Sequence, residues 1–407
     1  MTDDPASPLP LSGVRILALE QMQALPYATQ LLARLGAEVV KVEPIRGGDS
    51  GRGAQPAMTD PEGRSVGATF LRNNFGKRSI CVDLKNPRGR QLVLDLAPRF
   101  DVIAENSKAG AFARLGLGYD DIRQVHPAAV YVSVSGFGNT TESPYRDWPA
   151  FAPIVEAMSG IYAMKQVGDK PPTVAPVGAL GDIGAALFAT VGILSALCHR
   201  DRTGDGVYVD IAMLDAVMAM TDIVTNFWSM GLRDGNVGPL ITDGFRAADG
   251  WFVVQVAREQ HFAALADTVG HPEWRSDPRL STRQGWVDHL EGVLRPAVEA
   301  WAGTRTRLEV CNVLTGAGIA AGPCLRDEEL VTDPHVAARD MLVELPRTDG
   351  VAQPVLVPGN PVRMVGVPAR SETRPPWLGE HTAEVLAGEL GLSEVELAVL
   401  RSDGAIG

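Results

Sequence analysis

One acidic residue, Asp182, stands directly after Gly181 at the start of a long apolar stretch. Large apolar residues then recur every three to four positions up to Cys198, and two arginines and Gly204 follow, which indicates a helix that ends there. A carboxylate at such a helix start either caps the helix or acts as a nucleophile. Spacing alone favours the cap, because capping aspartates are common. The apolar run 184–198 has 15 residues, so we expect a helix buried in a soluble core rather than a membrane span.

Composition limits the classes of protein that fit. The 407 residues suggest two domains, and 45% hydrophobic with 21% charged residues is typical of a globular protein. The net charge of −12 argues against nucleic acid and anionic membranes as main partners. The four cysteines form no C-x-x-C, no histidine pair has metal-ligand spacing, and the N-terminus lacks a signal-peptide pattern. We therefore expect a cytoplasmic protein without a metal site.

Strand and helix patterns alternate through the first half of the chain. This alternation predicts an α/β fold, a mostly parallel sheet with helices on both faces. A glycine-rich loop at residues 231–244 is expected to separate this part from a smaller domain with a short sheet segment at 251–256. The strands are expected at residues 14–19, 37–42, 80–84, 101–104, 130–134 and 207–211, and the helices at 27–35, 87–100 and 213–228.

Two polar segments could bind an anionic ligand. Lys77 lies in the basic stretch 72–80, and Asn106 and Arg114 follow the strand expected at 101–104. Ligands of open α/β sheets bind at the carboxyl ends of strands, which is where Asn106 falls. By spacing alone, a solvated basic turn and a polar loop remain the simpler interpretations. The glycines of residues 47–53 do not form a dinucleotide-binding fingerprint.

Many sequence blocks, in order along nearly the whole chain, carry a family resemblance. They include QALP at 23–26, LLARLGAEVVKVEP, NNFGKRSICVDLKNPRGR, the AEN that ends at Asn106, YVSVSGFG, the GD…RTG…VDIAMLDA segment with Asp182, AGIAAGPC and LGEHTAEVL. Together they resemble the class III CoA-transferases, the CaiB/BaiF family, which also contains α-methylacyl-CoA racemases. The number and order of the blocks make this resemblance specific.

The resemblance implies a fold that spacing could not show. Members are interlocked homodimers, whose large Rossmann-like domain combines the N- and C-terminal parts of the chain with an inserted small α+β domain between them. Here the large domain would comprise residues 1–225 and 331–407, and the small domain with its linkers residues 226–330. The implied partners are acyl-CoA, a carboxylic acid and a second copy of the chain.

The resemblance also assigns Asp182 as the catalytic nucleophile. It implies that the carboxylate forms a mixed anhydride with the donor acyl group and then an aspartyl-CoA thioester. A helix N-terminus is expected to favour the ionised carboxylate by roughly 0.3–1 kcal/mol. No permanent cofactor is implied, since coenzyme A and acyl-CoA are substrates. The residues implied to bind substrate or CoA are Gln23, Arg46, Lys77, Asn106 and Arg114.

Departures from the family pattern leave one alternative open. The family often has a basic residue where Pro44 stands here, so Arg46 is a substitute, and a histidine where Gln21 stands. Racemases of the family pair the aspartate with an upstream histidine, but Phe151 takes that place here. Two acid–base groups are needed to move an α-proton, and Glu156 could be a base or a structural residue. CoA transfer is therefore favoured over racemisation, and residues 231–244 could serve as an active-site flap.

Overall fold

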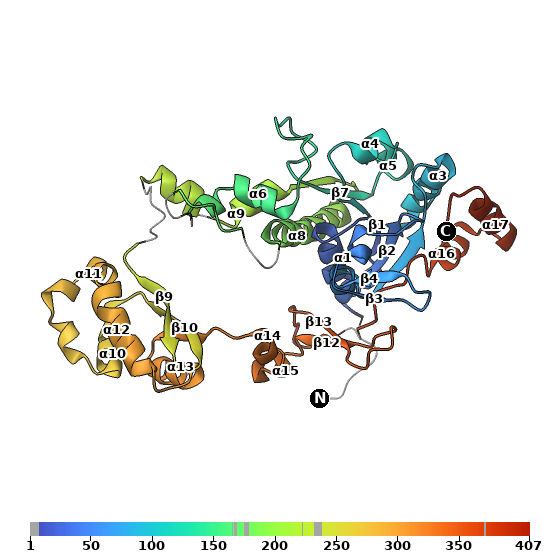
Figure 1. The fold of residues 1–407 in the computed structure, drawn as a ribbon. Helices are drawn as coiled ribbons and strands as arrows, with labels where there is room; N and C mark the ends of the chain where they lie inside the picture. Colours follow the sequence, from blue (N-terminus) through green and yellow to red (C-terminus); the bar gives the residue numbers. More distant parts are fainter. Residues whose placement is uncertain are drawn as a thin grey trace. The chain divides into compact units, whose positions relative to one another are not determined.

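The computed structural model describes residues 8–164, 166, 169–174, 179–221, 223–231, 238–369 and 372–407. The chain forms two compact units (Figure 1). The first comprises Met1–Thr225 with Ala338–Gly407, and the second comprises Asn226–Ala337. We describe each unit by itself.

A six-stranded sheet in which all neighbouring strands are parallel forms the centre of the first unit. Its order is β5-β2-β1-β6-β7-β8, so the strand order reverses between β1 and β6, as in Rossmann-type sheets. This confirms the predicted mixed α/β fold with a parallel sheet. The strands are β1 Arg15–Leu19, β2 Glu38–Glu43, β5 Lys77–Cys81, β6 Val102–Glu105, β7 Val130–Ser135 and β8 Tyr208–Ala212.

The inner strands β1, β2, β6 and β7 bury both of their faces, because successive side chains point to opposite sides of the sheet, whereas the edge strand β8 is mostly half-buried. Ile16 and Ala18 of β1 face one hydrophobic core, and Leu17 and Leu19 face the other. The first core is covered by α1 Ala24–Arg34, α6 Ala152–Met158, α8 Leu180–Thr203 and α9 Met213–Ala219. The second is covered by α3 Pro87–Leu96, α4 Ala111–Arg114, α5 Tyr119–Val125, α16 Thr382–Leu390 and α17 Glu394–Ser402.

The end of the chain returns to the N-terminal sheet. Figure 1 shows the red helices α16 and α17 beside the blue helix α3, and α16 also contacts β5. The amide of Cys81 donates to Thr382 Oγ1 at 3.0 Å, and Val82 forms an isolated bridge with Ile406. The C-terminal residues therefore complete one helical layer of the first unit.

Helix α8 is longer than the apolar run suggested. It has 24 residues, and an 18-residue window with a mean hydropathy of 1.8 is 44% buried. The expectation that this segment is too short to cross a bilayer is therefore wrong, because α8 is long and apolar enough to do so. Core helices of soluble proteins share this length and composition, and α8 packs on β7 and β8 beside α1 and α9. Its packing is that of a core helix.

Two other segments differ from the sequence expectation. The helix expected over residues 213–228 ends as α9 at Ala219, and a π-helical turn, Ile223–Phe227, follows. Part of the loop expected at 231–244, residues 232–237, lies outside the described residues. The strand β9 Ile241–Ala247 begins inside that range, because its apolar residues Ile241 and Phe245 pack into the core of the second unit.

The second unit contains an antiparallel sheet of order β11-β10-β9 with helices packed on one core. Its strands are β9, β10 Gly250–Val256 and β11 Ala320–Pro323. Its helices are α10 Glu259–Val269, α11 Arg283–Asp288, α12 Arg295–Ala302, α13 Arg307–Gly316 and α14 Asp327–Leu330, and α15 Pro334–Ala338 lies at the boundary.

The first unit carries further short elements beside the central sheet. A small core joins Phe70 and Phe75 to Val357 of the C-terminal part. The elements here are β3 Ala57–Thr59, β4 Ser65–Gly67, α2 Ala68–Asn73, β12 Leu342–Leu345 and β13 Val355–Pro358, and α7 Ile161–Met164 follows α6.

If α17 is part of the core of the first unit, Leu397→Ala will lower the free energy of unfolding by about 2–5 kcal/mol, since Leu397 is 1% exposed. Val395→Ala on the same helix is the control, because Val395 is 74% exposed and its truncation should stay within about 0.5 kcal/mol. Urea denaturation compares the two. Equal effects would contradict the packing of α17.

Candidate active site

A cavity of about 330 Å³ opens where the strand order reverses. The segments that follow β1, β6 and β7 all contribute to it, as the rule for open α/β sheets predicts. Three of the sequence-predicted residues, Gln23, Asn106 and Asp182, line this one cavity. Its other lining residues include Gln21, Met22, Ser107, Lys108, Ser135, Gly136, Arg146, Trp148, Phe151 and Met213.

The side chain of Asp182 does not cap its helix. Helix α8 begins at Leu180 with Ala179 as N-cap, so Asp182 is its third residue. The amide of Gly181 donates at 3.0 Å to Glu156 Oε1, on α6. Within the described part of the chain, the Asp182 carboxylate has no hydrogen bond or ion pair. The simpler interpretation of Asp182 as a cap is therefore wrong, because Glu156 supplies the capping carboxylate.

The environment of Asp182 opposes its ionisation. Burial, and then the nearby charge of Glu156, raise the pKa of Asp182 to about 6. Burial and the charge of Glu156 therefore outweigh the stabilisation of the ionised form that we expected from the helix N-terminus. A carboxyl group with this pKa is mostly ionised at neutral pH but protonated in moderate acid.

The loop after β1 is held by Asn106. Asn106 Oδ1 accepts from the Gln21 amide at 2.9 Å, and Asn106 Nδ2 donates to the Gln21 carbonyl at 2.9 Å. Gln23 follows as the N-cap residue of α1. Asn106 therefore joins the carboxyl ends of β1 and β6 and fixes the backbone beside Gln23.

Met22, between Gln21 and Gln23, has a left-handed backbone with φ of 62°. This conformation is unfavourable for a residue with a side chain. Asp49 Oδ1 accepts from the Met22 amide at 2.8 Å, and Asp49 Oδ2 pairs with Lys41 Nζ at 2.8 Å. Burial alone would raise the pKa of Asp49, but the Lys41 charge and the hydrogen bonds hold it below its usual value. A buried ion pair therefore stabilises a strained turn at the cavity.

Lys77 belongs to the same buried charge cluster and does not line the cavity. Lys77 Nζ donates to Glu20 Oε1 at 2.6 Å, to the Pro26 carbonyl at 2.8 Å and to Asn74 Oδ1 at 3.0 Å. Burial lowers the pKa of Lys77 to about 8, against the charge of Glu20. All three ammonium protons are used inside the protein, so this geometry leaves no donor for a CoA phosphate.

Arg46 and Arg114 are exposed and also lie outside the cavity lining. Arg114, at the end of α4, folds over the loop that follows Asn106. Its Nη1 lies 3.0 Å from the position that a Cβ on Gly110 would occupy, where the backbone has φ of 71°. Arg46 lies in the loop after β2.

The sequence interpretation missed Lys108 and Arg146, two cations that line the cavity. Lys108 stands two residues after Asn106, and Arg146 follows the GFGN turn after β7. Their position after parallel strands was the available signal. Phe151, at the place of the racemase histidine, is 67% exposed and lines the cavity, and none of the described histidines does so.

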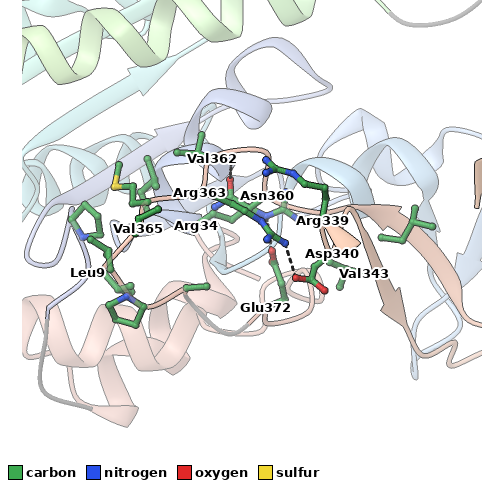
Figure 2. A pocket seen from close by; sticks show the side chains of 17 residues that line it. Leu9, Arg34, Arg339, Asp340, Val343, Asn360, Val362, Arg363, Val365 and Glu372 are labelled. Carbon is green, nitrogen blue, oxygen red and sulfur yellow. Dashed lines mark hydrogen bonds and ion pairs between the residues drawn. The ribbon is translucent and has the colours of Figure 1, made fainter. Parts of the chain in front are cut away.

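A larger cavity of about 630 Å³ lies elsewhere in the first unit (Figure 2). Two ion pairs cross it, Arg34 with Glu372 at 3.0 Å and Arg363 with Asp340 at 2.6 Å. It contains none of the predicted site residues. Its size alone does not make it a better candidate, because its arginines are largely neutralised by acidic partners.

Comparison with known proteins agrees with the geometry. Residues 11–382 match CoA-transferase family III. The chain belongs to this family. It is 35% identical to succinyl-CoA–D-citramalate CoA-transferase of Chloroflexus aurantiacus over 98% of both chains. It is 34% identical to formyl-CoA:oxalate CoA-transferase of Streptomyces avermitilis over 97% of this chain and 99% of that protein.

A solved structure also resembles this family III CoA-transferase. The CaiB/BaiF family protein from Brucella suis superposes with a TM-score of 0.81 at 29% identity, covering 94% of this chain and 100% of that chain. Succinate–glutarate CoA-transferase of Agrobacterium fabrum is 36% identical over 95% of this chain and 97% of that protein. The present protein is thus an enzyme that transfers CoA to carboxylic acids.

The buried charges under Met22 can be tested through stability. Lys41→Met is expected to lower the free energy of unfolding at pH 7 by about 3–5 kcal/mol, because Glu20 and Asp49 lose a buried counter-charge. The pKa of Asp49 is depressed in the native enzyme, so its contribution is present at neutral pH and lost as the pH falls. Without the Lys41 charge, burial raises the pKa of Asp49, so in Lys41→Met this carboxyl takes up a proton at a higher pH than in the wild type, and the deficit should shrink as the pH falls from 7 towards 4.

Urea denaturation at several pH values measures this difference. The control is Lys85→Met, since Lys85 is exposed and its removal should change little at any pH. A deficit for Lys41→Met that is small, or that does not change with pH, would contradict the role of this ion pair.

Proposed function

We propose that this CoA-transferase works through covalent intermediates on Asp182. The observation that supports this most directly is the state of the Asp182 carboxylate. It lines the cavity at the reversal of the strand order, and no described residue forms a hydrogen bond or ion pair with it. A carboxylate that stabilises nothing in the resting fold is available to attack a substrate.

The reaction begins when a carboxylate oxygen of Asp182 attacks the carbonyl carbon of the donor acyl-CoA. The carbon–sulfur bond breaks, the CoA thiolate leaves, and a mixed anhydride remains. The thiolate then attacks the aspartyl carbonyl carbon, and the donor acid leaves with one oxygen of Asp182. An acceptor carboxylate attacks the resulting aspartyl-CoA thioester, and the same steps in reverse release the new acyl-CoA.

The surroundings of Asp182 suit this chemistry. Water would hydrolyse an anhydride, so a partly buried carboxylate in a narrow cavity is favoured. Gln23 and Asn106 line the cavity and are the proposed contacts to the reacting end of CoA. Arg114 and Arg46, exposed outside it, are the proposed phosphate contacts. Lys77 is given the structural role that its three internal hydrogen bonds support.

The enzyme is proposed to act as the interlocked homodimer that the resemblance implies, with residues 226–330 as a small domain. Support comes from apolar side chains on one helix pair of the first unit. Leu187, Phe188 and Val191 of α8 and Met218 of α9 are exposed in the isolated chain. A second copy that covers them would remove this apolar surface from water.

Racemisation is not proposed. It requires a second acid–base group facing the α-carbon. Phe151 stands at the expected histidine position, and Glu156 is buried, bound to Gly181 and outside the cavity lining. The cavity lining that the structure describes therefore contains no histidine and no second carboxylate to serve as that partner of Asp182.

A dicarboxylic acid is the proposed substrate class. Relatives from Chloroflexus aurantiacus and Agrobacterium fabrum carry succinyl-CoA or succinate in their names. Lys108 and Arg146 line the same cavity as Asp182, and neither has a carboxylate partner within the described ranges. Two unneutralised cations fit the distal carboxylate of such an acyl group.

Replacing the nucleophile tests the mechanism. Asp182→Ala and Asp182→Asn are expected to lower transfer by roughly three orders of magnitude or more, with CoA binding retained. Wild type mixed with acyl-CoA and hydroxylamine should give a hydroxamate on the peptide that carries residue 182, measured by mass spectrometry. Asp215→Asn is the control, since Asp215 is the third residue of α9, as Asp182 is of α8, but does not line the cavity. Full transfer by Asp182→Ala would exclude the mechanism.

The substrate class is tested with matched donors. Succinyl-CoA and butyryl-CoA have acyl chains of equal length, and only the first has a distal carboxylate. We expect kcat/KM to be at least about tenfold higher for succinyl-CoA, the gain of one charge-assisted interaction. Equal values, or a preference for butyryl-CoA, would contradict the assignment.

A further inference from the structure

Glu156 is a buried acid that the proposed mechanism does not use. It lies on α6, is 1% exposed, and does not line the cavity. Its carboxylate accepts from the Gly181 amide at 3.0 Å and from the Tyr162 hydroxyl. Both partners are donors, so the ionised carboxylate is the form that these contacts suit.

We propose that Glu156 is a positioning residue for CoA transfer: it caps α8 from outside the helix, which leaves Asp182 free, and its charge sets the pH range in which Asp182 attacks. The inference rests on the proposed role of Asp182 as nucleophile and adds to it a residue that touches neither substrate nor CoA.

The first part of the proposal concerns the start of α8. The first amides of a helix lack internal partners, and an acidic side chain commonly accepts from them. Here the N-cap residue is Ala179, which has no side-chain acceptor. Glu156 fills that role through Gly181, the residue directly before Asp182. Asp182 therefore stays in the first helical turn without being bound to its own helix.

The second part concerns charge. Glu156 is the ionisable group whose charge acts on Asp182, in the same direction as burial. Helix α7 contributes the neutral Tyr162, and α9, which also contacts α6, carries Asp215. The pKa of Asp215 is instead raised by burial and by the charge of Asp210. A carboxylate with a raised pKa is a stronger nucleophile once it is ionised, but it is protonated in moderate acid.

Two substitutions separate capping from charge. Glu156→Gln removes the negative charge but keeps an amide oxygen that can accept from Gly181. Glu156→Ala removes the charge and the acceptor, and it leaves the Gly181 amide without this partner. Both variants should change the pH dependence, and only Glu156→Ala should also misplace Asp182.

The experiment is the pH profile of kcat/KM for the full-length enzyme, together with hydroxylamine trapping. Wild type should lose activity as the pH falls through about 6, because the ionised Asp182 is the attacking form. In Glu156→Gln this acidic limb should move to lower pH by roughly half a unit or more, as expected when a neighbouring like charge is removed. The plateau kcat should fall by less than about tenfold, and the hydroxamate at residue 182 should still form.

Three further variants complete the design. Glu156→Ala should show the same shift with a larger loss of kcat and little change in KM. Glu142→Gln removes an exposed acid that does not line the cavity and should leave the limb in place. Tyr162→Phe removes one of the two donors that hold the Glu156 carboxylate in place, and it should shift the limb in the same direction by less. Tyr162→Phe allows the inference to be tested even if neither Glu156 variant folds.

An unchanged limb in Glu156→Gln, with trapping at residue 182 intact, would overturn the inference and leave the mechanism standing. Loss of turnover and trapping at every pH in a folded Glu156→Gln would also overturn it, since Glu156 would then act directly in the chemistry. Absence of trapping in wild type would instead refute the proposed role of Asp182.

Discussion

The reversal of strand order between β1 and β6 determines where this enzyme can bind a ligand. The chain leaves β1 into α1 on one face of the sheet, and it leaves β6 towards α4 and α5 on the other face. The two carboxyl ends therefore diverge and open a crevice. Gln23 and Asn106 both line this crevice, because each lies in the segment that follows one of these strands. The start of α8, packed on the first face, brings Asp182 to the same place.

The turn beside the crevice is held by charges that are themselves buried. Glu20, Lys41, Asp49 and Lys77 lie in the interior beneath the turn at Met22. Burying charge is unfavourable unless every ion is paired, so such a cluster is a poor way to gain stability alone. Here the charge cluster holds Met22 in the left-handed region and so fixes the backbone beside Gln23. Strained backbone at a functional site is commonly maintained in this way.

The parts of the fold that depend on local pattern could be predicted from the sequence. Alternating strands and helices indicated the parallel sheet, and the rule for strand ends predicted Asn106 at the edge of the sheet where the cavity lies. The cap at α8 could not be predicted, because Glu156, whose carboxylate accepts from the Gly181 amide, lies 25 residues earlier in the chain. Lys77 looked like part of an exposed basic turn for the same reason: Glu20 lies 57 residues earlier. The domain and dimer assignments remain predictions from the family resemblance.

The central claim is that an oxygen atom of Asp182 becomes part of the acid released. Its most direct test follows oxygen-18 from a labelled acceptor carboxylate during repeated turnover, with mass spectrometry of the peptide that contains Asp182. Our account predicts that this peptide gains heavy oxygen only when donor acyl-CoA is present and transfer occurs. If transfer proceeds through many turnovers and the peptide stays unlabelled, Asp182 forms no anhydride and the account is wrong.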